Sequence, residues 1–159
     1  MGYSDSDWAG DVVDRRSTSG YGFFLCGGLV SFASTKQRTV ALSSLEAEYA
    51  AVALTVKEAL WIMRWLQQVG INITSVPIYM DNQGAIAFAK NAQFSQRTKH
   101  VDIKFYFIRD LIEEGTIKLY YVASENNNAD ILTKSLDRVK FEKLRIELGV
   151  EDSITNSGN

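Results

Sequence analysis

Four acidic residues, far apart in the chain, occupy comparable places in the sequence pattern. Asp81 ends a short apolar run at 78–80, and Asp5 lies within an alternating segment near the N-terminus. Glu46 and Asp130 each fall in the first turn of a predicted helix. Carboxylate oxygens are hard ligands that suit Mg²⁺ or Mn²⁺. Two such cations, about 3.5–4 Å apart, would activate a water and stabilise the leaving oxygen of a phosphodiester.

Two of these acids have a neighbour that competes for the same role. Glu46 follows Ser43 at the spacing of a capping box, and Glu48 lies near the other edge of the same apolar stripe. Asp7 shares a strand face with Asp5. Any single acid of this kind is commonly a helix cap or a solvated residue. The residues alone therefore leave open which glutamate and which N-terminal aspartate would bind a metal.

The hydrophobic pattern predicts the elements that must position these acids. Alternation predicts strands, and apolar residues at helical spacing predict helices. The predicted strands lie at 2–8, 21–26, 29–34, 76–81 and 116–122, and the predicted helices at 43–70, 82–90, 101–114 and 129–136. Gly27-Gly28 is expected to form the turn of a hairpin. We expect an α/β (α+β mixed) fold in which three antiparallel strands are followed by two parallel strands, with helices on the faces of the sheet.

Composition limits the alternatives. The chain has 159 residues, of which 46% are hydrophobic, enough for one domain with a core. We expect a single domain at 1–149 that includes a C-terminal helix at about 137–148, followed by a disordered tail at 150–159. One histidine and one cysteine cannot form a structural zinc site. A net charge of -2 counts against a purely electrostatic nucleic-acid binder, and no apolar run predicts a membrane span.

Five short motifs occur in a fixed order along the chain. They are Ser-Asp-Ser-Asp-Trp-Ala-Gly-Asp at 4–11, Arg-Ser-Thr-Ser-Gly-Tyr at 16–21, Ser-Ser-Leu-Glu-Ala-Glu-Tyr at 43–49, Thr-Lys-His-Val-Asp-Ile at 98–103 and Ala-Asp-Ile-Leu-Thr-Lys at 129–134. This set resembles the ribonuclease H domain of copia-type retrotransposon Pol polyproteins. The resemblance covers roughly residues 2–148. Because five motifs recur in order, it is far more specific than any one of them.

The resemblance implies an activity and a metal site. It implies an endonuclease that cuts the RNA strand of RNA–DNA hybrids during reverse transcription, with two Mg²⁺ or Mn²⁺ ions. The family's ligand positions correspond here to Asp5, Glu46, Asp81 and Asp130. The family pattern favours Asp5 over Asp7 and Glu46 over Glu48. It also implies a polymerase domain in the same polyprotein, no membrane association, and a cytoplasmic location within virus-like particles.

The same resemblance suggests substrate contacts. Ser43 and Gln83 occupy positions from which this fold can read the 2′-hydroxyls of a minor groove. Arg97 and Lys99 are candidates for phosphate contacts, although a solvated surface charge is an equally good explanation for each. The basic segment at 91–99 is short, and the loop at 123–126 lacks the histidine of cellular relatives. We therefore expect the domain to depend on the attached polymerase for its grip on the hybrid.

Two other functions fit a chain of this kind. One is an inactive binding module, like the connection domains of reverse transcriptases, but such modules usually lose acids and none is lost here. The other is a related phosphoryl-transfer enzyme such as an integrase. That class uses three acids at a different spacing and accepts substrates made only of DNA.

Overall fold

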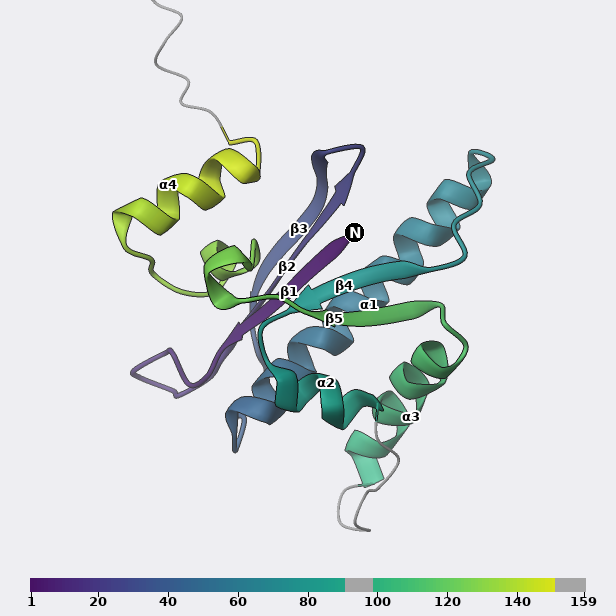
Figure 1. The fold of residues 1–159 in the computed structure, drawn as a ribbon. Helices are drawn as coiled ribbons and strands as arrows, with labels where there is room; N and C mark the ends of the chain where they lie inside the picture. The colour runs from purple at the N-terminus through teal and green to yellow at the C-terminus, as the bar shows by residue number, and fades with distance from the viewer. Residues whose placement is uncertain (91–98, 151–159) are drawn as a thin grey trace, which may run out of the picture.

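A five-stranded mixed sheet runs through the protein (Figure 1). The computed structural model describes residues 1–90 and 99–150. The strands are β1 Gly2–Asp7, β2 Thr18–Leu25, β3 Gly28–Lys36, β4 Val76–Met80 and β5 Ile117–Tyr121. Their order in the sheet is β3-β2-β1-β4-β5, with β1, β2 and β3 antiparallel and with β4 and β5 parallel to β1. The predicted arrangement of three antiparallel strands followed by two parallel strands is confirmed.

The hairpin between β2 and β3 turns one residue earlier than the glycine pair predicted. The turn residues are Cys26 and Gly27, whose φ values are 51° and 84°. Two successive positive φ values define the type I′ turn, whose twist matches that of a hairpin. Gly28 instead becomes the first residue of β3 and pairs with Leu25.

Three helices cover one face of the sheet and enclose the core. They are α1 Ser44–Gln68, α2 Gln83–Lys90 and α3 Lys99–Glu113, and α1 crosses behind the sheet in Figure 1. The residues of β4 that point into the core, Ile78 and Met80, are apolar and fully buried. On the central strand β1, Ser4 is also fully buried and accepts a hydrogen bond from Thr55 of α1. Val52 and Val56 of α1 pack in the same cluster. The predicted helical spacing thus describes the buried stripe of α1 correctly.

The opposite face carries α4 Arg138–Glu147 and two short 3-10 helices, η1 Ser124–Asn126 and η2 Asp130–Leu132. The predicted helix at 129–136 is wrong, because only η2 forms there. The Thr133 hydroxyl donates to the Asp5 carboxylate instead of remaining on a helix surface, and the chain then turns toward Asp137, the N-cap of α4. Tertiary contacts of polar side chains therefore override the local helical pattern.

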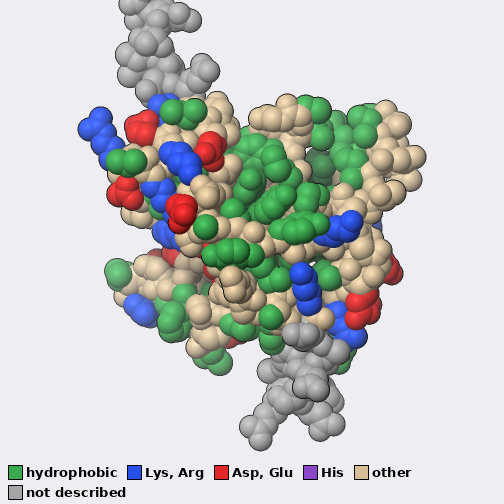
Figure 2. All heavy atoms as spheres, viewed as in Figure 1, with side chains coloured by type: hydrophobic (Ala, Val, Ile, Leu, Met, Phe, Trp, Pro, Cys, Tyr) green, Lys and Arg blue, Asp and Glu red, His purple; other side chains and the backbone are tan. Residues whose placement is uncertain are grey.

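The part of this sheet face beyond α4 is aromatic. Figure 2 shows apolar side chains gathered in the middle of the face, beside the charged surface of α4. Tyr3 stacks on Tyr79 with ring centroids 5.4 Å apart, and Tyr79 stacks on Tyr120 at 5.6 Å. Stacked cross-strand pairs of this kind tie neighbouring strands together. Among the described residues, none of the helices combines the length and apolarity that a membrane crossing requires.

Candidate active site

Three aspartates converge where β1 and β4 run toward the same end of the sheet. Asp5 lies in β1, Asp81 follows the last residue of β4, and Asp130 begins η2. Each offers a carboxylate oxygen, and these oxygens all lie within 4.8 Å of one another. Asp5 and Asp130 are buried, and Asp81 is half-buried. The structure therefore brings together three of the four acids that the sequence singled out.

A glycine and an asparagine bring Asp130 to the sheet. Gly20 of β2 pairs with Asp5, and a Cβ atom at Gly20 would lie 2.6 Å from the Thr133 methyl group. Only glycine therefore lets the η2 segment pack directly over β1 and β2. Asn127 is fully buried, and its side-chain amide donates to the Ser4 carbonyl, at 3.1 Å. These contacts place Asp130 beside Asp5 although 125 positions separate them in the sequence.

Polar side chains hold each aspartate in place. The Thr133 hydroxyl donates to Asp5, and the Ser124 hydroxyl donates to Asp81. Lys134 Nζ lies 2.9 Å from Asp130 and 3.5 Å from Asp5. Sequence analysis did not single out these three partners, although Thr133 and Lys134 close the motif at 129–134. The hydroxyls of Thr133 and Ser124 and the ammonium of Lys134 satisfy carboxylate oxygens that burial removes from water, and so help to keep the cluster ordered.

The two glutamates of α1 have different surroundings. Glu46 is exposed, and its carboxylate accepts a hydrogen bond of 2.7 Å from the Leu42 backbone N–H while its own N–H donates to Ser43. These two hydrogen bonds form a variant of the capping box, because Glu46 accepts from Leu42, the residue before the N-cap, and not from Ser43 itself. Glu48 is only 6% exposed and faces the charges of Asp5 and Asp81. The structure does not bring Glu46 to the aspartates, so we replace it by Glu48 in the proposed acid set.

Burial and like charges oppose ionisation at the centre of this cluster. Burial, followed by the charges of Asp5 and Asp81, raises the pKa of Glu48 to about 9. Burial also raises the pKa of Asp5 to about 6; Lys134 and Thr133 oppose this rise, and Asp130 and Asp81 add to it. Glu48 Oε2 is buried and has no hydrogen-bond partner among the described residues. Additional positive charge at this point would compensate both effects.

These shifts predict how the stability of the metal-free protein depends on pH. A carboxyl group with a raised folded-state pKa stabilises the fold below its unfolded pKa, and this contribution is lost as the pH rises through the folded pKa. For Glu48 the window runs from 4.5 to about 9. In EDTA, we expect Glu48→Gln to match the wild type at pH 5 and to melt roughly 3–6 °C higher at pH 9. Melting curves at both pH values test this. A Tm difference that does not grow with pH would contradict it, and Glu46→Gln, which keeps the capping box, is the control.

The other residues predicted to bind metal or substrate are not part of the aspartate cluster. Asp7 is engaged elsewhere, because its carboxylate accepts from the Thr18 backbone N–H. Ser43 is the N-cap of α1, and Gln83 is an exposed residue at the start of α2. Arg97 lies outside the described residues, as does the side chain of Lys99. The predicted roles of these residues in binding substrate stay predictions.

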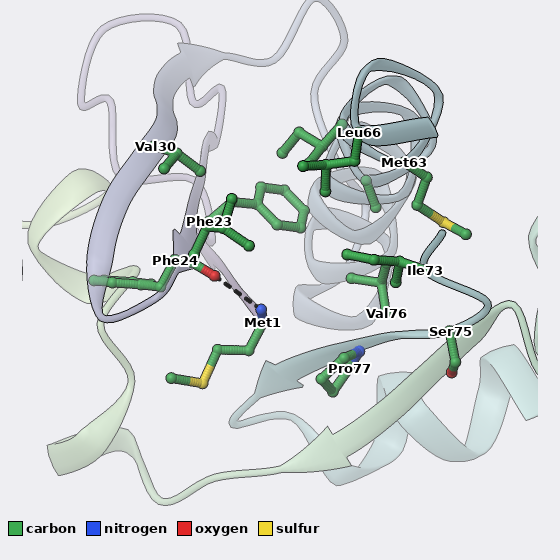
Figure 3. A pocket seen from close by; sticks show the side chains of 13 residues that line it. Met1, Phe23, Phe24, Val30, Met63, Leu66, Ile73, Ser75, Val76 and Pro77 are labelled. Atoms are coloured by element: carbon green, nitrogen blue, oxygen red, sulfur yellow. Dashed lines mark hydrogen bonds between the residues drawn. The ribbon is translucent and has the colours of Figure 1, made fainter. Parts of the chain in front are cut away.

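An apolar pocket lies at the other end of the sheet and is not the candidate site. Figure 3 shows its walls, with Met1 and Phe24 on one side and Met63 and Leu66 of α1 on another. The Met1 amino group donates to the Phe24 carbonyl, at 3.0 Å. The pocket is lined by apolar side chains and Ser75, without a carboxylate among the described residues. It belongs to the packing of α1 on the sheet.

The chain is similar in sequence to Pol polyproteins of plant transposons. It is 40% identical over 96% of its length to the retrovirus-related Pol polyprotein from transposon TNT 1-94 of Nicotiana tabacum. It is 42% identical over 93% of its length to that from transposon RE1 of Arabidopsis thaliana. The chain spans only about a tenth of the length of these relatives, 11% and 10% respectively. No family model matches it.

Two solved structures share the architecture. Ribonuclease H1 from the archaeon Halobacterium salinarum has a TM-score of 0.59 at 16% identity, covering 83% of this chain and 92% of its own. LC11-RNase H1, in complex with an RNA/DNA hybrid, has a TM-score of 0.58 at 15% identity, covering 83% and 91%. The chain has the ribonuclease H fold. Together with the Pol homologues, the ribonuclease H fold fits the predicted ribonuclease H domain of a copia-type Pol polyprotein.

Proposed function

We propose that this chain hydrolyses the RNA strand of RNA–DNA hybrids, as the ribonuclease H domain of a retrotransposon Pol polyprotein. The observation that carries the proposal is the convergence of the carboxylate oxygens of Asp5, Asp81 and Asp130. Glu48 of α1 is outside this group but is buried and interacts electrostatically with Asp5 and Asp81, so we add it to the set. The homologous Pol polyproteins and the ribonuclease H fold support it. A related structure contains an RNA/DNA hybrid, which supports the choice of substrate.

The acid set fits a divalent-metal site. All four side chains offer hard oxygen donors, which suit Mg²⁺ or Mn²⁺. Glu48 Oε2 is buried without a hydrogen-bond partner among the described residues. Burial first, and neighbouring carboxylates after it, raise the pKa values of Glu48 and Asp5, and a bound cation would favour the ionised form of both. Two bound cations would supply the charge that activates a water and stabilises the leaving oxygen of a phosphodiester.

The chain's own residues would orient and hold this site. The Thr133 and Ser124 hydroxyls each donate to one carboxylate oxygen, of Asp5 and Asp81 respectively, and would leave the second oxygen of each for a cation. Lys134 lies between Asp130 and Asp5, and its positive charge reduces the net negative charge of the cluster. Because these donors hold the carboxylates in fixed positions, the cations that the carboxylates bind would meet a phosphodiester without rearrangement of the site.

The decisive experiment compares three labelled duplexes of the same sequence side by side. We expect cleavage of the RNA–DNA hybrid in Mg²⁺ or Mn²⁺, no cleavage in EDTA, and no cleavage of duplex DNA or duplex RNA. Cleavage of duplex DNA would favour an integrase-like enzyme. Absence of cleavage, together with absence of Mn²⁺ binding at millimolar concentration, would favour an inactive module. Because the domain is expected to depend on the polymerase for substrate binding, the assay should also include the polymerase-linked form.

A further inference from the structure

A lysine from the C-terminal helix reaches into the acid cluster. Lys140 lies in the first turn of α4, and its ammonium contacts Asp130 Oδ2. Lys134 Nζ lies 2.9 Å from the other oxygen of the same carboxylate, Oδ1. Asp130 is fully buried, so both of its oxygens face an ammonium group rather than water. Lys134 belongs to the segment that carries Asp130, whereas Lys140 comes from a separate element.

Contacts along α4 fix the position of Lys140. Asp137 is the N-cap of the helix and accepts a hydrogen bond of 3.0 Å from the Lys140 backbone N–H. Leu144 is fully buried. One turn after Lys140, the Lys143 ammonium donates to the Glu125 carbonyl at 3.0 Å and to Asn126 Oδ1 at 2.7 Å. The helix therefore holds the Lys140 ammonium against Asp130 instead of leaving it free in solvent.

We propose that Lys140 competes with the divalent cation for Asp130, so that helix α4 sets the metal affinity of the site. This inference rests on the proposed metal site. A divalent cation on Asp130 Oδ2 would displace the Lys140 ammonium, because the two positive charges would repel at short range, whereas Lys134 stays on Oδ1. Asp130 therefore exchanges Lys140 for the cation when the metal binds. This exchange makes the metal affinity lower than the four carboxylates alone would give.

The test is the affinity of the full chain for Mn²⁺, measured by calorimetry without nucleic acid. Lys140→Met removes the competing charge and keeps a long apolar stem, and we expect it to bind Mn²⁺ at least about tenfold more tightly. Lys140→Arg keeps the positive charge and should bind within about threefold of the wild type. Arg138→Met is the matched control, because Arg138 is an exposed cation on the same helix that makes no hydrogen bond or ion pair with an acid among the described residues, and its Mn²⁺ affinity should be unchanged.

Thermal unfolding gives a second readout that does not depend on activity. In EDTA, Lys140→Met should melt lower than the wild type because the acids lose a countercharge, and saturating Mn²⁺ should remove this difference. Arg138→Met should show the same difference in melting temperature from the wild type in both conditions. Wild-type binding of Mn²⁺ with equal or weaker binding by Lys140→Met would overturn the competition alone. If the wild type binds no Mn²⁺ at millimolar concentration, the metal site and the competition both fail.

Discussion

Asp81→Asn is expected to abolish cleavage of a labelled RNA–DNA hybrid, with a loss of roughly a thousandfold or more, or about 4 kcal/mol of transition-state stabilisation. The asparagine has nearly the same shape, and its side-chain oxygen can still accept the hydrogen bond that Ser124 donates to Asp81. The substitution therefore removes a charged ligand and leaves the local packing intact. Single-turnover cleavage in Mg²⁺ measures the effect directly.

The fold of Asp81→Asn provides the control. Asp81 raises the pKa values of both Asp5 and Glu48, so its charge opposes theirs in the metal-free protein. We expect the melting temperature in EDTA to be equal to that of the wild type or higher. A variant that folds and still cleaves the hybrid at a rate near that of the wild type would show that Asp81 is not a metal ligand.

Glu48→Gln is expected to reduce hybrid cleavage by roughly a hundredfold or more, whereas Glu46→Gln should stay within about threefold of the wild type. In the metal-bound protein, both substitutions remove one negative charge from the same helix, two positions apart. Glutamine still serves in a capping box, so Glu46→Gln keeps the hydrogen bond from the Leu42 backbone N–H. Comparing the two variants therefore shows whether activity depends on where the lost charge was, and not only on the loss of one charge.

The reverse outcome would restore the assignment that the family pattern favoured. If Glu46→Gln lost activity and Glu48→Gln retained it, the exposed glutamate would have to reach the aspartates in the active form. Mn²⁺ titration of both variants separates a loss of metal binding from a loss of folding. We expect weakened Mn²⁺ binding only for Glu48→Gln.

The choice between the two glutamates shows where sequence reasoning fell short. The buried stripe of α1 contains Val52 and Val56, and Glu48 stands four residues before Val52 on the same face. Helical periodicity therefore contained a signal for Glu48. The three-residue spacing between Ser43 and Glu46 predicted a helix cap, and the structure confirms that Glu46 bonds to Ser43. This cap explains Glu46 without any catalytic role. A residue committed to a helix cap is a poor candidate for a buried metal site.

The sheet could be predicted from the sequence, whereas the conformation of the region after Asn127 could not. The sheet of three antiparallel strands followed by two parallel strands was predicted, and the structure agrees. The structure also brings Asp5 and Asp81 together, although only Asp81 ends an apolar run. The region after Asn127 did not follow its local pattern, because the Asn127 side chain accepts from the Ala129 backbone N–H and holds a tight turn. Contacts with β1, distant in sequence, add to this local turn, because Asn127 also donates to the Ser4 carbonyl and Thr133 donates to Asp5. Periodicity alone could not find them.

The tie between Asn127 and Ser4 joins the first strand to a segment near the other end of the chain. A nascent or prematurely cut chain that ends before this segment would carry Asp5, Glu48 and Asp81 without Asp130, and Gly20 would face water. Such a fragment would present a partial set of ligands and no nuclease. Under the proposed function, hydrolysis of a hybrid therefore requires a chain that extends past Asp130.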